Sequence, residues 1–248
     1  MHDSGILHRL GTLDVPGIGA RHLRIYVPRA RPKKRPPSLL VLFDGQNVFD
    51  DAPSFNGVGW RAHEAVEKLR SHAPIVMAVE HGGDERLDEL SPFASESSRG
   101  LLPALVGWLA DVVVVDAWNT LGVLPEPRGV MIGGSSMGGL AAMYAHHVRP
   151  DRFGSALCMS SSFWFGGGRI LDYVARSARP HGSRIYLDVG KREGRGMVEP
   201  SRRLVALLHA RGYDDTTLRF RLDARGRHDE RAWRRRLGAA VRFLSTPR

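Results

Sequence analysis

Short apolar runs alternate with longer stretches of helical spacing along most of this chain. Residues 22–28 alternate apolar and polar positions, as in a half-buried strand. Residues 38–43 form a continuous apolar run that stops at Asp44, which is typical of a buried central strand. The same criteria predict further strands at residues 74–79, 129–133, 154–160, 184–189 and 217–222.

Stretches with helical spacing separate these runs. The predicted helices are residues 60–70, 101–118, 137–147, 200–211 and 229–244. Segment 101–118 contains β-branched residues, but it is too long for one strand and must bridge two strands. Pro200 is expected in the first turn of its helix, and Gly212 just past the end. The alternation predicts an α/β fold, with a mainly parallel sheet of about eight strands and helices on both faces.

The whole chain, residues 1–248, is interpreted as one domain, because no repeat or low-complexity linker interrupts it. A hydrophobic fraction of 42% and a charged fraction of 25% are ordinary for a globular protein. The single cysteine, Cys158, excludes an internal disulfide and favours a reducing compartment. Residues 1–19 lack the pattern of a signal peptide, and the aliphatic run 112–115 is too short to cross a bilayer. We therefore expect a cytoplasmic protein without a membrane partner.

The net charge of +10 raises the question of nucleic-acid binding. The basic residues are scattered over the chain, however, and nearly all are arginine. Two clusters remain, at residues 29–35 and 234–236. The first is interpreted as an exposed, proline-containing loop and the second as the solvated face of a terminal helix. We expect no nucleic-acid partner.

A G-x-S-x-G motif centred on Ser136 follows the predicted strand 129–133, and a helix rich in small residues follows the motif. In open parallel sheets, active sites gather beyond the carboxyl ends of the strands. A serine at the apex of a sharp strand-to-helix turn is held out as a nucleophile, and glycines on either side prevent collision. The bare motif arises by chance in roughly one such chain in four, the alternative being a turn without chemistry. Its strand–turn–helix context predicts that Ser136 is a nucleophile.

A serine nucleophile needs a histidine base and an acid that orients this base. In sheets of this kind the chain order is nucleophile, acid, histidine. His228 follows the last predicted strand and is the predicted base, because His181 precedes a strand and His209 lies inside a predicted helix. Glu193 is the preferred acid. Asp188 is the alternative, although its side chain would point to a face of the sheet.

The reaction also needs two backbone N–H groups that stabilise an oxyanion. Met137, directly after the nucleophile, is predicted to supply one, and Gln46, after the first buried strand, the other. Gly45 is expected to let the backbone turn toward the site. His146 and His147 are adjacent on a helix and face different directions, so they are not expected to share a metal ion. No metal or cofactor is expected.

These residues resemble the bacterial esterase branch of the α/β-hydrolases, which includes enterochelin-type, feruloyl and acetyl-xylan esterases, S-formylglutathione hydrolases and mycolyltransferases. The segments that carry the resemblance, in the family's order, are residues 42–50, 60–69, 89–92, 134–139, 150–154, 160–165, 190–193 and 226–229, with Trp233. The resemblance implies an α/β-hydrolase fold with a Ser136, Glu193 and His228 triad. It also suggests that Asn47 and Trp164 line the substrate cleft.

The chain departs from the family pattern between Pro92 and Gly129, where it is short and unusually apolar, and the loop at residues 166–168 leaves no room for a large lid domain. The expected function is a serine carboxylic-ester hydrolase that forms an acyl-enzyme with a small-molecule ester. A siderophore-like or other polyester is one candidate substrate, since the arginines would attract an anionic ligand. Two alternatives remain open: acyl transfer to an alcohol, and a non-catalytic binding module.

Overall fold

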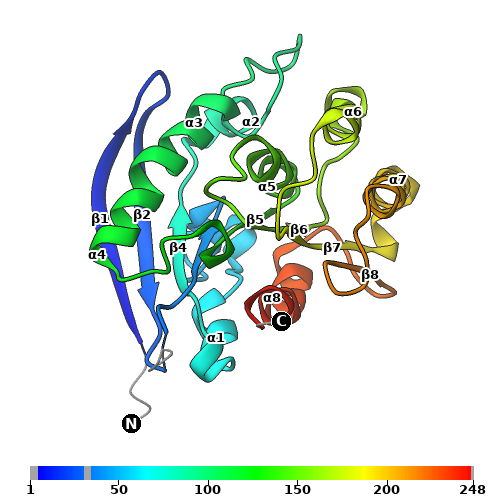
Figure 1. Ribbon diagram of the computed structural model, residues 1–248. Helices are drawn as coiled ribbons and strands as arrows, with labels where there is room; N and C mark the ends of the chain where they lie inside the picture. Colours follow the sequence, from blue (N-terminus) through cyan, green and yellow to red (C-terminus); the bar gives the residue numbers. More distant parts are fainter. Residues whose placement is uncertain (1–4, 31–34, 247–248) are drawn as a thin grey trace.

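A central sheet of eight strands runs through the computed structural model, which describes residues 5–30 and 35–246 (Figure 1). The strand order is β1-β2-β4-β3-β5-β6-β7-β8. Strand β2 runs antiparallel to β1 and β4, and the pairs from β4 to β8 are parallel. The strands are β1 (Ile6–Val15), β2 (Gly19–Val27), β3 (Leu39–Leu42), β4 (Ile75–Val79), β5 (Val130–Ser135), β6 (Ser155–Met159), β7 (Arg184–Gly190) and β8 (Leu218–Asp223).

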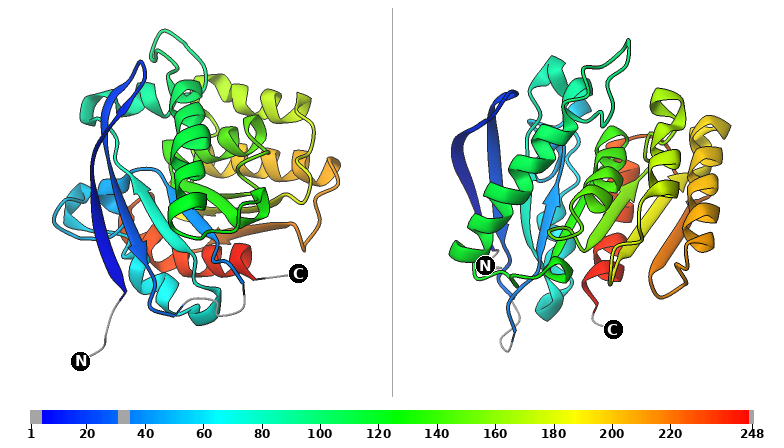
Figure 2. Two further views of the ribbon diagram at one scale, coloured as in Figure 1. Left: turned by 60° about the vertical axis from the view of Figure 1, so that its left-hand side comes forward. Right: turned by 45° about the horizontal axis from the view of Figure 1, so that its top comes forward.

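Helices cover both faces of this sheet (Figure 2), which confirms the predicted fold class. Helices α3 to α7 lie on one face, and α1 and α8 on the other. Helix α3 continues through the π-helical turn Leu109–Val113 into α4, as the prediction of a helix at residues 101–118 requires. The helices are α1 (Ala62–Glu67), α2 (Arg86–Glu89), α3 (Leu102–Trp108), α4 (Val114–Thr120), α5 (Met137–Val148), α6 (Arg169–Arg176), α7 (Arg195–Ala210) and α8 (Glu230–Ser245).

Successive residues of the central strands supply two separate hydrophobic cores. Leu39 and Val41 pack with the layer of α3 to α7, whereas Leu40 and Leu42 pack with α1 and α8. All four side chains are fully buried. A strand points alternate side chains to opposite faces, so a strand covered on both faces has to be apolar throughout. The two layers therefore explain the continuous apolar run at residues 38–43.

The structure differs from the sequence-based predictions at four elements. Strand β1 and the helices α2 and α6 were not predicted, and β1 lies at the edge of the sheet with most of its side chains exposed. Helix α7 begins at Arg195 rather than at Pro200, so the proline lies inside the helix and removes one backbone hydrogen bond. Of the basic cluster at residues 29–35, residues 31–34 lie outside the described part of the chain.

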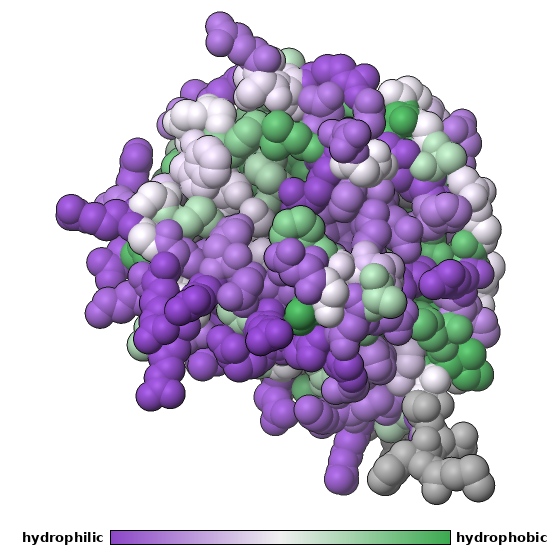
Figure 3. All heavy atoms as spheres, turned by 180° about the vertical axis from the view of Figure 1, so that it is seen from behind, coloured by the Kyte–Doolittle hydropathy of each residue, from purple (hydrophilic) through white to green (hydrophobic). Residues whose placement is uncertain are grey.

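The segment Leu102–Thr120 is long and apolar enough, by length and composition, to cross a membrane. Half of this segment is buried in the structure, where Leu105, Leu109 and Val113 pack into the core. The rear face of the molecule is mainly hydrophilic, with hydrophobic side chains in small patches (Figure 3). The apolar character of the segment is thus accounted for by its packing as a core helix.

Candidate active site

Ser136 occupies the sharp turn between β5 and α5. Its backbone angles are φ 54° and ψ −119°, which correspond to the first central residue of a type II′ turn. This conformation favours glycine, so the serine there is strained. Its N–H donates to the Met159 carbonyl, at 3.0 Å, which ties the turn to β6. The turn therefore holds the hydroxyl beyond the carboxyl end of β5.

Two glycines make the turn possible because other elements approach them closely. A Cβ on Gly134 would lie 2.7 Å from the carbonyl carbon of Gly138, so backbone would meet backbone. A Cβ on Gly139 would overlap the Ser161 hydroxyl. The small residues around Ser136 thus serve close packing of β5, α5 and the loop after β6.

The structure brings Ser136, His228 and Glu193 together in one line of hydrogen bonds. Ser136 Oγ lies 3.0 Å from His228 Nε2, and His228 Nδ1 lies 2.8 Å from Glu193 Oε2. The carboxylate accepts, so Nδ1 carries the hydrogen and Nε2 is free to accept from the Ser136 hydroxyl. Glu193 ends the turn after β7 and His228 lies in the loop before α8, so both side chains come from the same edge of the sheet.

The Glu193 carboxylate is buried and has further donors on its second oxygen. Glu193 Oε1 accepts from the Ser160 hydroxyl and from the Gly190 N–H, both at 2.6 Å. Burial acts to raise the pKa of Glu193, but the hydrogen bonds from His228, Ser160 and Gly190 outweigh it and lower that pKa. The carboxyl group is therefore ionised at neutral pH, as an orienting acid must be.

Asp188, the alternative acid, lies in β7 and has a different partner. Its fully buried carboxylate forms an ion pair with Arg236, with Oδ1 3.0 Å from Nη1. Burial raises its pKa to about 7, which the charge of Arg236 only partly opposes. Since His228 pairs with Glu193, the geometry favours Glu193 as the acid.

The imidazole of His228 packs edge-on against Trp233, with ring centroids 5.1 Å apart and an interplanar angle of 84°. Trp233 in turn packs against Trp60, so the ring is supported from the core. The side chain of His228 nevertheless remains 38% exposed. Ser162, which sequence reasoning did not single out, brings its hydroxyl within 3.2 Å of Ser136 Oγ. The imidazole is thus exposed to solvent on one side and packed against the aromatic core on the other.

Gln46 and Met137 present the two backbone amides that were expected to hold an oxyanion. Neither N–H has a hydrogen-bond acceptor within residues 5–30 and 35–246. Met137 is the first residue of α5, where the helix dipole adds partial positive charge. The side chain of Gln46 points elsewhere, because its Nε2 donates to the His81 carbonyl at 2.8 Å. The two N–H groups that the oxyanion role requires are thus not used by backbone acceptors in the described part of the chain.

The turn before Gln46 differs from the prediction for Gly45. The left-handed residue is Asp44, with φ 58°, and not the glycine. Gly45 is required for space instead, because a Cβ there would lie 2.7 Å from the carbonyl carbon of Val79. The buried Asp44 carboxylate accepts two hydrogen bonds from Arg86, at 2.5 and 2.9 Å. This ion pair, which the sequence did not predict, holds the turn beside the site.

Asn47 and Trp164, which the family resemblance suggested as cleft residues, have different environments. The Asn47 side chain is buried, and its Oδ1 accepts from the Phe55 N–H at 2.8 Å, so it anchors the loop before α1. Trp164 is 51% exposed, and its Nε1 donates to Met197 Sδ at 3.1 Å. Of the two, Trp164 is the one that offers a surface to a ligand.

Within the described residues, no group of three or more His, Cys, Asp or Glu side chains is placed to hold a metal ion. His146 and His147 are buried and have separate partners, the Phe153 carbonyl at 2.7 Å and the Met143 carbonyl at 3.0 Å. Burial lowers their pKa values to about 3 and about 4, so both are neutral. Their partners are those of core histidines.

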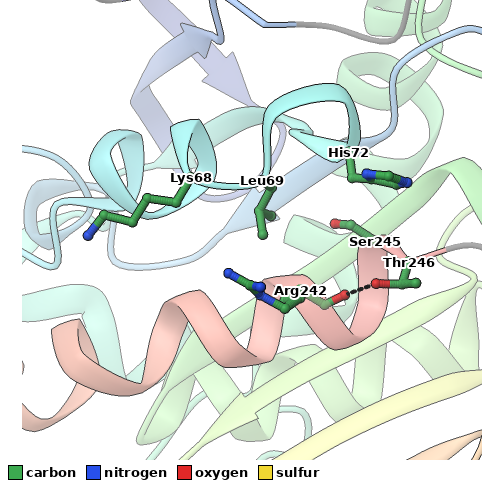
Figure 4. A pocket seen from close by; sticks show the side chains of 6 residues that line it. All are labelled: Lys68, Leu69, His72, Arg242, Ser245 and Thr246. Atoms are coloured by element: carbon green, nitrogen blue, oxygen red, sulfur yellow. Dashed lines mark hydrogen bonds between the residues drawn. The ribbon is translucent and has the colours of Figure 1, made fainter.

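Two hollows lie near α8 and α5. A cavity of about 200 Å³ is at the far end of α8 from His228, where the side chains of Lys68 and His72 point apart (Figure 4). A helix of this length spans about 24 Å, so the cavity is distant from Ser136. A smaller apolar pocket lies one helical turn after Ser136, at Leu140, and its lining residues are Pro92, Phe93, Leu140, Phe165, Gly166 and Ile170.

The mostly parallel sheet, with its serine turn after the central strand β5, defines the α/β-hydrolase class. The model of the family described as "Putative esterase" matches residues 19–244. The chain therefore belongs to this family of ester-hydrolysing enzymes, as the resemblance predicted.

Three relatives illustrate the likeness. The chain is 24% identical over 197 residues to the uncharacterized protein YbbA of Bacillus subtilis. The matched region covers 75% of this chain and 74% of the relative. The chain is 32% identical over 141 residues to the iron(III) enterobactin esterase of Dickeya dadantii. This match covers 54% of this chain and 28% of that enzyme. The structure of the Shigella flexneri enterobactin esterase superposes with a TM-score of 0.70 at 19% identity, covering 99% of this chain and 59% of the other. The chain thus spans only part of these two enterobactin esterases.

Proposed function

We propose that this chain hydrolyses carboxylic esters through an acyl-enzyme on Ser136. His228 takes the hydroxyl proton through Nε2 while Ser136 Oγ attacks the carbonyl carbon of the ester. The tetrahedral intermediate then collapses and expels the alcohol, which receives the proton from His228. A water molecule, deprotonated by His228, attacks the acyl group, and the carboxylic acid leaves with Ser136 restored.

The observation that carries this proposal is the unbroken line of hydrogen bonds at 3.0 and 2.8 Å from Ser136 through His228 to Glu193. Glu193 keeps the imidazole in the tautomer that can accept a proton and stabilises the imidazolium that forms. The free N–H groups of Gln46 and Met137 support the role of oxyanion donors. Loss of one such donor typically lowers kcat by about 10²- to 10³-fold.

The substrate class we propose is an ester that carries negative charge. Exposed basic residues lie in the chain next to Glu193 and next to His228. None of them forms an ion pair within the part of the chain that the structure describes. These residues are Lys191, Arg192, Arg195, Arg225 and Arg227. Relatives named iron(III) enterobactin esterase make an iron-siderophore ester one candidate. The apolar pocket at Leu140 is a candidate site for the acyl or alcohol group.

The location and the partners are further parts of this proposal. Cys158 is a free, fully buried thiol, which supports a reducing compartment such as the cytoplasm. Since the unpaired arginines flank the triad, we assign them to the ester substrate rather than to nucleic acid or a membrane.

The experiment that tests this function is a set of p-nitrophenyl and siderophore esters assayed with wild type, S136A, E193Q and H228A. We expect a burst of alcohol release equal to the enzyme concentration, and loss of turnover in S136A and H228A. E193Q should retain the fold but turn over far more slowly. Full hydrolysis by S136A would refute the proposal. Addition of a competing alcohol distinguishes hydrolysis from acyl transfer, because a transferase would convert the acyl group into a new ester.

A further inference from the structure

Arg236 lies in the middle of α8 and is only 1% exposed. The sequence interpretation of residues 234–236 as a solvated face is wrong for this residue. Trp233, Arg236, Leu237 and Ala240 follow the helical spacing of one face, and that face packs against the sheet. Burial of a guanidinium group is unfavourable unless the group is paired and hydrogen-bonded, so its partners have to account for its position in the core.

The guanidinium of Arg236 lies near two buried carboxyl groups, those of Asp188 and Glu193. Its Nη1 pairs with Asp188 Oδ1 at 3.0 Å, and its Nη2 donates to the Ser160 hydroxyl at 2.8 Å. The same Nη2 lies 3.7 Å from Glu193 Oε1, the oxygen that does not contact His228. The group therefore lies behind the acid of the site, on the side away from Ser136.

Ser160 connects Arg236 to Glu193. Its hydroxyl accepts from Arg236 and donates to Glu193 Oε1, at 2.6 Å. A guanidinium group only donates, so the single hydroxyl hydrogen of Ser160 has to point at Glu193. The backbone of Ser160 is fixed as well, because its N–H donates to the Asp188 carbonyl at 2.8 Å. The direction of this bond is thus set by Arg236.

We propose that Arg236 is a positioning residue of the hydrolytic site: acting through Ser160, it holds Glu193 in its orientation toward His228 and favours the ionised carboxylate. This inference rests on the proposed triad. The contact between Asp188 Oδ1 and Arg236 Nη1, at 3.0 Å, holds the guanidinium group in place.

A stabilising role explains the buried ion pair of Arg236 and Asp188 less well than a positioning role does. A buried ion pair is often no more stabilising than apolar residues of the same volume. The other titratable groups around Asp188 are Cys158 and Tyr186, whose pKa values are raised by burial and which are therefore neutral. Arg221 faces Tyr186 from β8, and His228 faces Glu193. Arg236 is thus the cation that lies between the two buried carboxyl groups.

The primary test compares R236Q with R235Q in the full chain, because Arg235 is exposed on the same helix and serves as the matched control. Rates are measured on an aryl ester between pH 5 and 9 and divided by the number of sites titrated with a fluorophosphonate. We expect R236Q to lower kcat by about tenfold or more with KM within about threefold, as for a group that acts on the transition state. The acid limb of its pH profile should steepen, because Glu193 then binds a proton in that range. R235Q should match wild type.

Two further variants separate a positioning role from a structural one. S160A should lower kcat in the same direction, and the double variant S160A/R236Q should lose no more than R236Q, because both changes break one chain of contacts. R236K, which keeps the charge without the fork, should be intermediate. A wild-type kcat per titrated site and pH profile in R236Q would overturn the inference, and so would multiplicative losses in the double variant. If R236Q fails to fold, unchanged kinetics in S160A would overturn it. S136A, assayed alongside, reports separately on the proposed function.

Discussion

Replacement of Ser136 by glycine should abolish activity and raise stability together. The serine has φ 54° and ψ −119°, a conformation that a side chain disfavours and glycine adopts freely. A residue held in such a region costs about 1–3 kcal/mol. Glycine also adds unfolded-state entropy, which offsets roughly 0.5–1 kcal/mol of the gain. The expected net stabilisation, taken between the middles of these two ranges, is about 1 kcal/mol.

S136A is the matched control, because alanine removes the hydroxyl but keeps the Cβ that causes the strain. Both variants should lose ester hydrolysis. For a chain of this length, about 1 kcal/mol corresponds to a rise in Tm of roughly 2–4 °C, which differential scanning calorimetry measures readily. We expect S136G to melt above S136A. A lower or equal melting temperature for S136G, with an unchanged fold, would refute the argument that the turn is strained.

Three other predictions follow from buried and charged groups. Burial lowers the pKa of His146 from 6.5 to about 3, so the unfolded chain binds a proton that the folded chain does not, and stability falls as the pH drops below about 6.5. In urea melts, His146→Asn should reduce the slope of that fall by about 1.4 kcal/mol per pH unit. In G134A the new Cβ meets Gly138, which should destabilise the protein by about 1–3 kcal/mol and slow fluorophosphonate labelling. R192Q/R227Q should lower kcat/KM and its salt dependence for an anionic ester, and leave a neutral aryl acetate unchanged.

The central sheet could be predicted from the sequence because its strands are covered on both faces. In residues 39–43 every side chain is apolar and buried, so the strand is visible as one uninterrupted apolar run. Strand β1 lies at the edge of the sheet, and of its residues only Val15 is buried. Its sequence therefore carries no alternation of buried apolar and exposed polar residues from which a strand could be predicted. The start of α7 was missed for another reason. Pro200 is tolerated inside that helix, where a local rule places it in the first turn.

The candidate site could be predicted only as far as local sequence determines it. Ser136, Glu193 and His228 each follow a strand of the parallel sheet, so their meeting at one edge follows from chain order and topology. The role of Arg236 depends on which face of α8 meets β6 and β7, and this is a tertiary contact. The same holds for Ser160, whose partners come from three different elements.

The proposed chemistry depends above all on Ser136 being an activated nucleophile. The most direct test is labelling of folded wild type and S136A with a fluorophosphonate, followed by intact-mass measurement and peptide mapping. We expect one label per wild-type chain, on the peptide that contains Ser136, and none on S136A. A folded wild type that stays unlabelled, or equal labelling of S136A, would contradict it.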